Sequence, residues 1–129
     1  MRKKITEIVR MMSQDKRKSE RVELAVILYY RLTGEAEWQG PHAAVNISGH
    51  GISFILSKEI AKLTEVDLKI VLPQDPQRPI EVKGEVIWVS PFGGRYRLGV
   101  RFFKMKEDDR RRFVSYICDT ILVTYLKDK

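Results

Sequence analysis

Cysteine and histidine are scarce in this sequence. Cys118 is the only cysteine, and His42 and His50 are the only histidines among 129 residues. A single cysteine excludes an internal disulfide, and these three residues do not make a convincing set of metal ligands. We therefore expect a fold that depends on its apolar core, with no metal and no cofactor.

Long apolar runs are also lacking. No stretch approaches the roughly 20 apolar residues that a membrane-spanning helix needs. Near the start, Glu7 interrupts the apolar segment that would follow Met1-Arg2-Lys3-Lys4 in a signal peptide. These two features, with the low cysteine content, predict a cytoplasmic protein without an integral membrane segment.

The sequence carries no recognisable catalytic motif. No acid/base pair, metal set or phosphate-binding loop stands out. Ser48 lies close to glycines, but a nucleophile elbow needs a glycine where Asn46 stands. We therefore expect a binding protein and not an enzyme.

Positive charge, in contrast, is abundant. Lysine and arginine total 24 against 17 aspartate and glutamate, a net charge of +7, and much of the excess lies in residues 1–21. Such a balance favours an acidic partner: nucleic acid, an anionic membrane surface or a phosphorylated small molecule. Charge alone does not choose among them.

The length predicts one domain with an N-terminal extension. Apolar residues spaced as in an amphipathic helix predict a short helix within residues 1–14. Its apolar face would pack either on the rest of the chain or on a second copy, which would give a homodimer. A polar linker begins at residue 15, and we assign 15–129 to the domain itself.

Alternation of apolar and polar residues then predicts a series of strands. Six short strands without intervening helices indicate an antiparallel sheet, and a closed barrel is favoured because closure removes exposed edges. We expect a single helical turn over 57–63, a hairpin turn over 90–94, and Trp88 and Phe102 in the core. The predicted strands are 22–32, 42–47, 52–56, 66–72, 80–88 and 96–102.

A C-terminal helix is expected to begin at Glu107, where three acidic residues favour a helix N-terminus. The helix is predicted to have a broad apolar face that caps the barrel. This face contains Phe113 and Ile117, four residues apart, and Val114 and Cys118, each one residue further on. The fold class is thus an all-β, six-stranded antiparallel barrel flanked by an N-terminal and a C-terminal helix.

Two clusters carry the predicted binding chemistry. Arg17 and Arg21 are four residues apart, so both guanidinium groups point to the same side of a helix or a strand and can meet one anionic, planar ligand. Asn46, Ser48 and Gly51 supply an amide, a hydroxyl and a close backbone approach at a hairpin turn. We expect the glycines of this turn to serve positive φ or close approach.

Together these clusters read Arg-x-x-x-Arg followed by Asn-x-Ser-x-x-Gly, which resembles the PilZ domain, the bacterial receptor module for cyclic di-GMP. The resemblance extends from about residue 15 to 125 and includes the segments 84–88 and 96–102. It implies a six-stranded barrel with a basic linker and a C-terminal helix.

The resemblance also implies roles for these residues. Arg17 and Arg21 would bind guanine and phosphate, and Asn46, Ser48 and Gly51 would form the platform beneath them. Asn46 stands where many members have aspartate, which we interpret as tuning of affinity. Lys16 resembles the basic residue that accompanies binding of two stacked ligand molecules per chain.

Three functions follow from these observations. The first is a cyclic di-GMP receptor whose linker reorders on binding and alters a contact with an unidentified protein partner. The second is a small barrel that binds nucleic acid through exposed aromatic residues. We do not favour it, because most aromatic residues occupy the alternate strand positions that are predicted to point into the core. The third is a degenerate PilZ adaptor that acts through protein contacts alone. The family's outputs include motility, exopolysaccharide synthesis and hence biofilm, pili and virulence.

Overall fold

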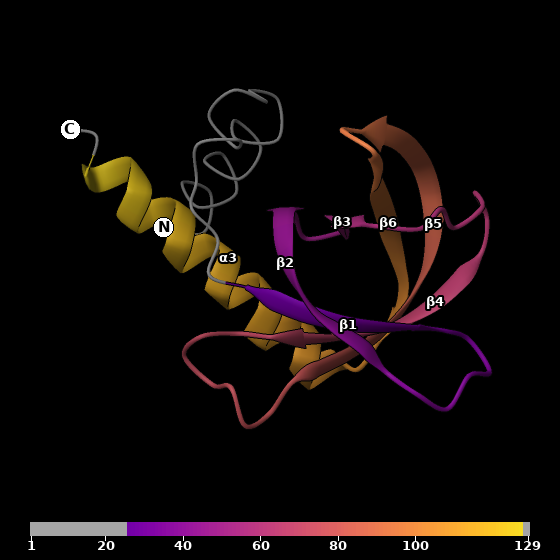
Figure 1. The fold of residues 1–129 in the computed structure, drawn as a ribbon. Helices are drawn as coiled ribbons and strands as arrows, with labels where there is room; N and C mark the ends of the chain where they lie inside the picture. The colour runs from indigo at the N-terminus through magenta and orange to yellow at the C-terminus, as the bar shows by residue number, and fades with distance from the viewer. Residues whose placement is uncertain (1–25, 128–129) are drawn as a thin grey trace.

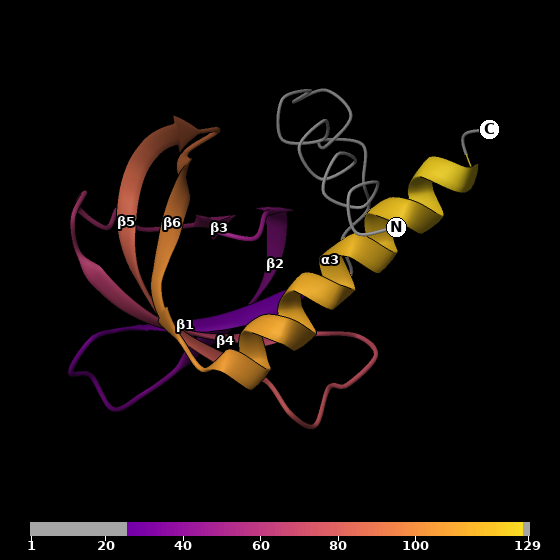
Figure 2. The ribbon, with the colours of Figure 1, turned by 180° about the vertical axis from the view of Figure 1, so that it is seen from behind.

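Six antiparallel strands close into a barrel that is followed by one long helix (Figures 1 and 2). The computed structural model describes residues 26–127, and side chains as far as residue 120. Around the barrel the strand order is β1-β2-β3-β6-β5-β4. The elements are β1 (Ile27–Leu32), β2 (Gln39–Ile47), β3 (Gly51–Leu56), β4 (Glu65–Val71), β5 (Ile80–Phe92), β6 (Arg95–Met105) and α3 (Glu107–Lys127).

The barrel and the C-terminal helix confirm the predicted fold class for the described residues. The predicted N-terminal helix, the linker and residues 22–25 of the first predicted strand lie outside those residues. Among the described helices, none is long and apolar enough to cross a membrane.

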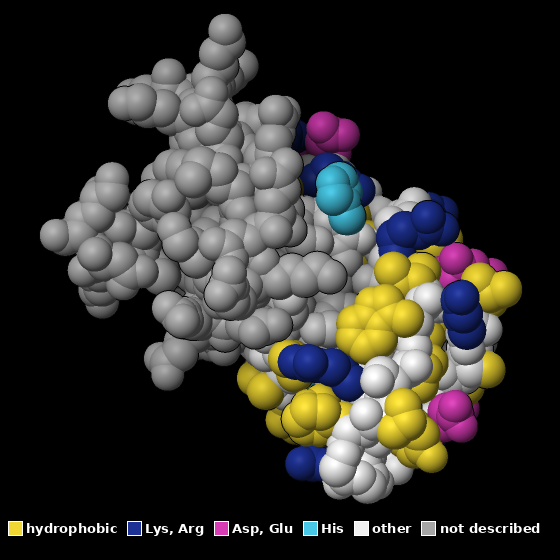
Figure 3. All heavy atoms as spheres, turned by 90° about the horizontal axis from the view of Figure 1, so that it is seen from above, with side chains coloured by type: hydrophobic (Ala, Val, Ile, Leu, Met, Phe, Trp, Pro, Cys, Tyr) yellow, Lys and Arg dark blue, Asp and Glu magenta, His cyan; other side chains and the backbone are white. Residues whose placement is uncertain are grey.

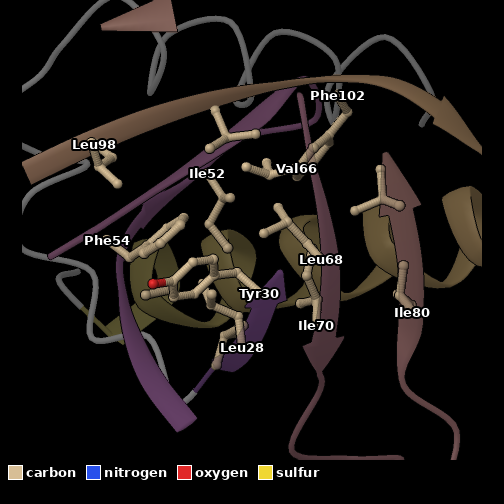
Figure 4. Packing of buried hydrophobic residues seen from close by; sticks show 14 of the residues in the cluster. Leu28, Tyr30, Ile52, Phe54, Val66, Leu68, Ile70, Ile80, Leu98 and Phe102 are labelled. Carbon is tan, nitrogen blue, oxygen red and sulfur yellow. The ribbon is translucent and has the colours of Figure 1, made fainter. Parts of the chain in front are cut away.

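The core fills the inside of the barrel, where alternate residues of each strand meet (Figure 4). Leu28, Leu68, Ile70, Ile80 and Leu98 are fully buried. Burial of each such side chain contributes about 1.5–3 kcal/mol before conformational entropy is subtracted. The strong alternation in the sequence therefore marks the residues that hold the barrel closed.

Helix α3 packs on the barrel through one turn near its start. Phe113, Tyr116 and Ile117 are buried, and the Phe113 ring meets Phe102 edge-on with centroids 5.5 Å apart. Phe113 and Ile117 thus lie in the predicted interface, and Phe102 lies in the core as predicted. Val114 does not, since 39% of it is exposed. Residues three and four apart share a helix face, so Tyr116 and Ile117 accompany Phe113, while its sequence neighbour points elsewhere.

The predicted helical turn over 57–63 is wrong. This segment is irregular, and its end pairs with β5: Leu63 N donates to Val86 O at 2.7 Å, and Val86 N donates to Thr64 O at 3.0 Å. Leu63 has φ of 75°. Backbone groups that bond to a neighbouring strand are not available for a helical turn, so the long-range pairing replaces the local one.

The β5–β6 hairpin is longer than predicted. Its strands continue to Phe92 and from Arg95, so the turn consists of Gly93 and Gly94 alone, with φ of 54° and 81°. Two consecutive residues with positive φ are typical of the tight hairpin turns whose twist matches the flanking strands. The hairpin therefore extends one residue pair and its turn beyond β3, which ends opposite Tyr96.

A polar cluster ties three strands together on the outside of the barrel. Asp67 is 8% exposed and accepts hydrogen bonds from Arg31 Nε (3.0 Å), Thr33 Oγ1 (3.2 Å) and Lys83 Nζ (3.4 Å). Burial by itself raises the pKa of Asp67, but the hydrogen bond from Arg31 and the charge of Lys83 outweigh it, so the pKa is lowered. The Arg31 guanidinium also lies 4.2 Å from the Trp38 ring centroid.

Candidate functional site

A continuous row of four residues crosses the outer face of the barrel. Asn46 on β2 pairs with Ser53 on β3, Ser53 pairs with Gly99 on β6, and Gly99 pairs with Trp88 on β5. Neighbouring strands are about 4.8 Å apart, so the row is roughly 14 Å long. It brings together residues that lie more than fifty positions apart in the sequence.

Two β-bulges bring the ends of this row to the outside. The register between β5 and β6 passes from Val86↔Val100 to Trp88↔Gly99, which leaves Ile87 as an extra residue. A similar shift on β2, between Ala44 and Asn46, precedes the other end. One extra residue reverses the in-and-out alternation of everything that follows.

The bulge explains why the prediction for Trp88 is wrong. By strict alternation Trp88 would follow Val82 and Val86 into the core. Instead it is 40% exposed, and Ile87 beside it is 36% exposed. An exposed aromatic side chain on a strand face is suited to stacking against a planar ligand.

A shallow hollow of about 200 Å³ lies over this row. Binding sites that enclose a whole small molecule measure about 300–1,000 Å³, so this hollow suits one planar ring system and not an entire dinucleotide. No aspartate or glutamate lines it, so an anionic ligand would meet no opposing carboxylate there. Its lining residues are Asn46, Ile47, Ser48, Gly51, Ile52, Ser53, Ile87, Trp88, Gly99 and Val100.

Gly99 determines where the indole of Trp88 lies. A Cβ built on Gly99 would overlap Nε1, Cε2 and Cζ2 of Trp88. The ring therefore covers the space that any other residue at position 99 would occupy. Glycine here fixes the indole against the sheet as one wall of the hollow.

The turn between β2 and β3 forms the rim of the hollow. Ser48 N donates to Gly51 O at 2.9 Å, and Ser48 Oγ accepts a hydrogen bond from His50 N at 3.2 Å. The turn is tied to β6 as well, because Phe102 N donates to His50 O at 2.8 Å. Ser48 is exposed, and its hydroxyl proton can still be donated to a ligand.

The glycines of this turn do not have positive φ, which leaves close approach as the other expected role. Close approach applies to Gly51, where a Cβ would collide with the backbone carbonyl of Val100. The approach is to strand β6. Gly51 thus serves the packing of the platform.

The structure brings Asn46, Ser48 and Gly51 together at one hollow. Arg17, Arg21 and Lys16 lie outside the described residues. Val26, the first described residue, bonds to β2 beside the site, with Ala44 N donating to Val26 O at 3.0 Å. Arg21 precedes Val26 by five residues, a reach of at most about 18 Å.

Sequence analysis missed Trp88, Gly99 and Ser53 as parts of the site. The signal that was available is Gly99 itself, a glycine inside an otherwise regular strand, which indicates close approach by another group. Its partner could not be identified without the strand register.

A second, larger hollow of about 610 Å³ lies between the β4–β5 loop and the start of α3. The arginines that line it pair with nearby aspartates. Arg112 bonds to Asp109 at 2.9 Å, to Asp75 at 3.2 Å and to the Arg78 carbonyl at 2.9 Å. These contacts fasten the loop to the helix. Among residues 26–127, no group of three metal-ligating side chains is found.

Comparison with known proteins agrees with this geometry. The PilZ domain family model matches residues 15–118. No curated protein sequence matches the chain.

Two solved structures share the fold. The inhibitor of motility MotI/DgrA of Bacillus subtilis is 18% identical with a TM-score of 0.59, over 80% of this chain and 48% of that one. MrkH of K. pneumonia, in its apo state, is 20% identical with a TM-score of 0.61, over 83% of this chain and 51% of that one. This chain therefore spans about half the length of each. Because the family model covers most of the sequence and the barrel carries the motif turn beside the hollow, this chain belongs to the PilZ domain family.

Proposed function

We propose that this chain is a cyclic di-GMP receptor that binds one guanine of the dinucleotide in the hollow beside Trp88. The observation that carries this proposal is the row from Asn46 to Trp88, with Ser48 at the rim of the hollow. Membership of the PilZ family supports it, since cyclic di-GMP is that family's ligand.

The described residues supply a floor and one wall for a guanine base. Stacking on the Trp88 indole would contribute about 1–3 kcal/mol. The Asn46 amide and the Ser48 hydroxyl provide hydrogen-bonding groups along the base edge. An amide has one acceptor oxygen where a carboxylate has two, so we expect weaker recognition of the guanine N–H groups than an aspartate would provide.

The hollow is too small for the whole ligand, which leaves the phosphates and the second base to the linker. Arg17 and Arg21 would cover the ligand from above. An arginine matches the O6/N7 edge of guanine in a bidentate pair worth about 1–3 kcal/mol, and it also pairs with phosphodiester oxygens. We propose that ligand binding reorders this linker, which would reposition residues 1–14 and alter a protein contact.

Isothermal titration of cyclic di-GMP tests the proposal directly. We expect saturable binding to the full chain that Arg17→Ala, Arg21→Ala and Ser48→Ala each weaken at least about tenfold, a loss of about 1.4 kcal/mol. Lys18→Ala is the matched control, because it removes a charge from the same linker outside the motif. A stoichiometry of two would support the role of Lys16, and Lys16→Ala should then reduce it to one.

GTP and a 15-residue oligodeoxythymidine serve as competitors. Absence of binding to the wild type would contradict the receptor proposal and favour a degenerate adaptor. Equal affinity for the oligonucleotide, falling steeply with salt, would favour the nucleic-acid alternative. That alternative retains one structural argument, because Trp88, Phe92 and Phe103 are 40–51% exposed, and for Trp88 this is contrary to the expected parity.

Motility is the first cellular process to examine as the output of this receptor. One structural neighbour is by name an inhibitor of motility. A deletion strain compared with Arg17→Ala and Arg21→Ala strains in a swimming assay would show whether this output depends on the ligand site.

A further inference from the structure

The outer part of the β5–β6 hairpin presents a surface that the proposed ligand site does not use. The strands are paired with each other as far as Phe92↔Arg95, whereas β3 ends at Leu56↔Tyr96. The pair Phe92↔Arg95 and the turn thus lie just beyond the end of β3, while Arg97 is still paired with Ile55 of β3. This tip stands away from α3 in both ribbon views (Figures 1 and 2). We call the exposed side chains of Phe92 and Arg95, together with the half-buried side chain of Arg97, the hairpin patch.

Apolar and basic groups alternate on this patch. Phe92 is 47% exposed, and Arg97 lies across it with the guanidinium carbon 5.6 Å from the ring centroid. Arg95 is exposed at the tip. Figure 3, which looks down on the hairpin end of the barrel, shows hydrophobic side chains next to lysine and arginine side chains.

The two arginines of the patch differ from most of those elsewhere in the described chain. Of the six described arginines outside the patch, five lie within 4 Å of a carboxylate: Arg31, Arg78, Arg101, Arg111 and Arg112. Neither Arg95 nor Arg97 does among residues 26–127, and no aspartate or glutamate occurs from residue 86 to 100. The patch is thus a local concentration of uncompensated positive charge.

Arg97 also carries an unsatisfied donor. Its Nε is buried and has no hydrogen-bond partner among the described residues. A buried donor without an acceptor destabilises the arrangement, so the stacked position of Arg97 on Phe92 is easily exchanged for one in which the guanidinium meets an acceptor. A carboxylate supplies two acceptor oxygens in the geometry that a guanidinium matches.

We propose that the hairpin patch binds an acidic segment of a partner protein, with carboxylates on Arg95 and Arg97 and an apolar side chain against Phe92. Aromatic residues and arginine are the side chains enriched at the energetic centres of protein interfaces. A single-stranded nucleic acid fits less well, because it stacks bases on open ring faces and Arg97 occupies one face of Phe92.

The patch adjoins the hollow on the same face of the sheet. Arg97 is two residues from Gly99 along β6, about 7 Å, and Phe92 is four residues from Trp88 along β5. A ligand stacked on Trp88 would therefore lie at the edge of the partner. The dependence of partner affinity on cyclic di-GMP rests on the proposed function; the patch itself does not.

Peptide selection on the full chain tests this surface. A phage-displayed library of random 12-residue peptides would be selected with and without cyclic di-GMP, and recovered peptides measured by fluorescence anisotropy. We expect peptides with several aspartate or glutamate residues and an apolar anchor. Phe92→Ala, Arg95→Glu and Arg97→Glu should each weaken them at least about tenfold, whereas Val114→Ala and Arg110→Glu, exposed changes on α3, should not.

Three outcomes would overturn the proposal. One is that no peptide is enriched, or that enriched peptides lack acidic residues. Another is equal loss of binding in Arg95→Glu and Arg110→Glu, which would indicate an effect of net charge alone. The third is that a 15-residue oligodeoxythymidine binds more tightly than the peptides and needs the same three side chains.

Titration of cyclic di-GMP into Phe92→Ala and Arg95→Glu separates this proposal from the proposed function. Neither residue lines the hollow, so both variants should bind the dinucleotide as the wild type does. Loss of peptide binding with dinucleotide binding retained supports the patch. If the wild type binds no dinucleotide, peptide binding that depends on the patch still supports the surface, and only its coupling to ligand fails.

Discussion

Replacing Gly99 with alanine should separate ligand binding from folding at this site. The added Cβ would overlap the Trp88 indole, and the three nearest atoms that it would meet all belong to that one side chain. Because Trp88 is 40% exposed, the ring can swing outward without opening the core. We therefore expect the barrel to remain folded while the stacking wall of the hollow is lost.

The size of the effect follows from the stacking that is removed. A base stacked on an aromatic ring is worth about 1–3 kcal/mol, which corresponds to a loss of roughly 5- to 150-fold in affinity. The stability cost should be smaller, about 1 kcal/mol, since overpacking at an exposed site can relax. Calorimetric titration of cyclic di-GMP and urea unfolding measure the two quantities, and near-ultraviolet circular dichroism reports the displaced indole.

Two comparisons make this test specific. Gly49→Ala is the matched control: it lies in the neighbouring turn, and its Cβ would meet nothing within 4 Å. A double-mutant cycle supplies the second comparison, because Gly99→Ala should have no further effect on affinity once Trp88→Ala is present. This account of the hollow would be refuted if Gly99→Ala bound cyclic di-GMP with wild-type affinity. It would also be refuted if Gly99→Ala lowered the affinity of the Trp88→Ala variant as much as it lowers that of the wild type.

Three further predictions concern the scaffold. Gly51→Ala should destabilise the barrel by about 1–3 kcal/mol in urea unfolding, because its Cβ would strike the rigid carbonyl of Val100 and no side chain can move aside; wild-type stability would contradict this contact. Phe113→Ala should cost about 3–5 kcal/mol, since the ring is fully buried, and a loss below 1 kcal/mol would show that α3 is not needed to close the core. Asp67→Asn should cost about 1–3 kcal/mol at pH 7 by weakening a buried hydrogen-bonded carboxylate. The folded pKa of Asp67 is lowered, so the difference in free energy of unfolding between wild type and Asp67→Asn should be fully present above the unfolded pKa near 4. It should disappear as pH falls through the folded pKa of Asp67. A stability difference that does not change down to pH 2 would contradict this account.

Much of the fold was predictable from local patterns. A strand exposes alternate residues to opposite faces, so the period-two pattern identified all six strands and their inward residues such as Leu68 and Leu98. The acidic first turn at Glu107 placed the start of α3, because charge near a helix terminus acts within one turn. The motif turn was equally accessible, since Asn46, Ser48 and Gly51 are close in sequence.

The rest depended on contacts between distant segments. Ile87 becomes a bulge only because β5 must keep its register with β6 on both sides of it, and that one extra residue moves Trp88 from the predicted core to the outer face. No local pattern contains this register. By itself the sequence thus determined which segments form strands and which turn carries the motif, because those properties reside in neighbouring residues. Only the tertiary structure decided that Trp88, Gly99 and Ser53 complete the platform with Asn46, because their alignment exists only across four paired strands.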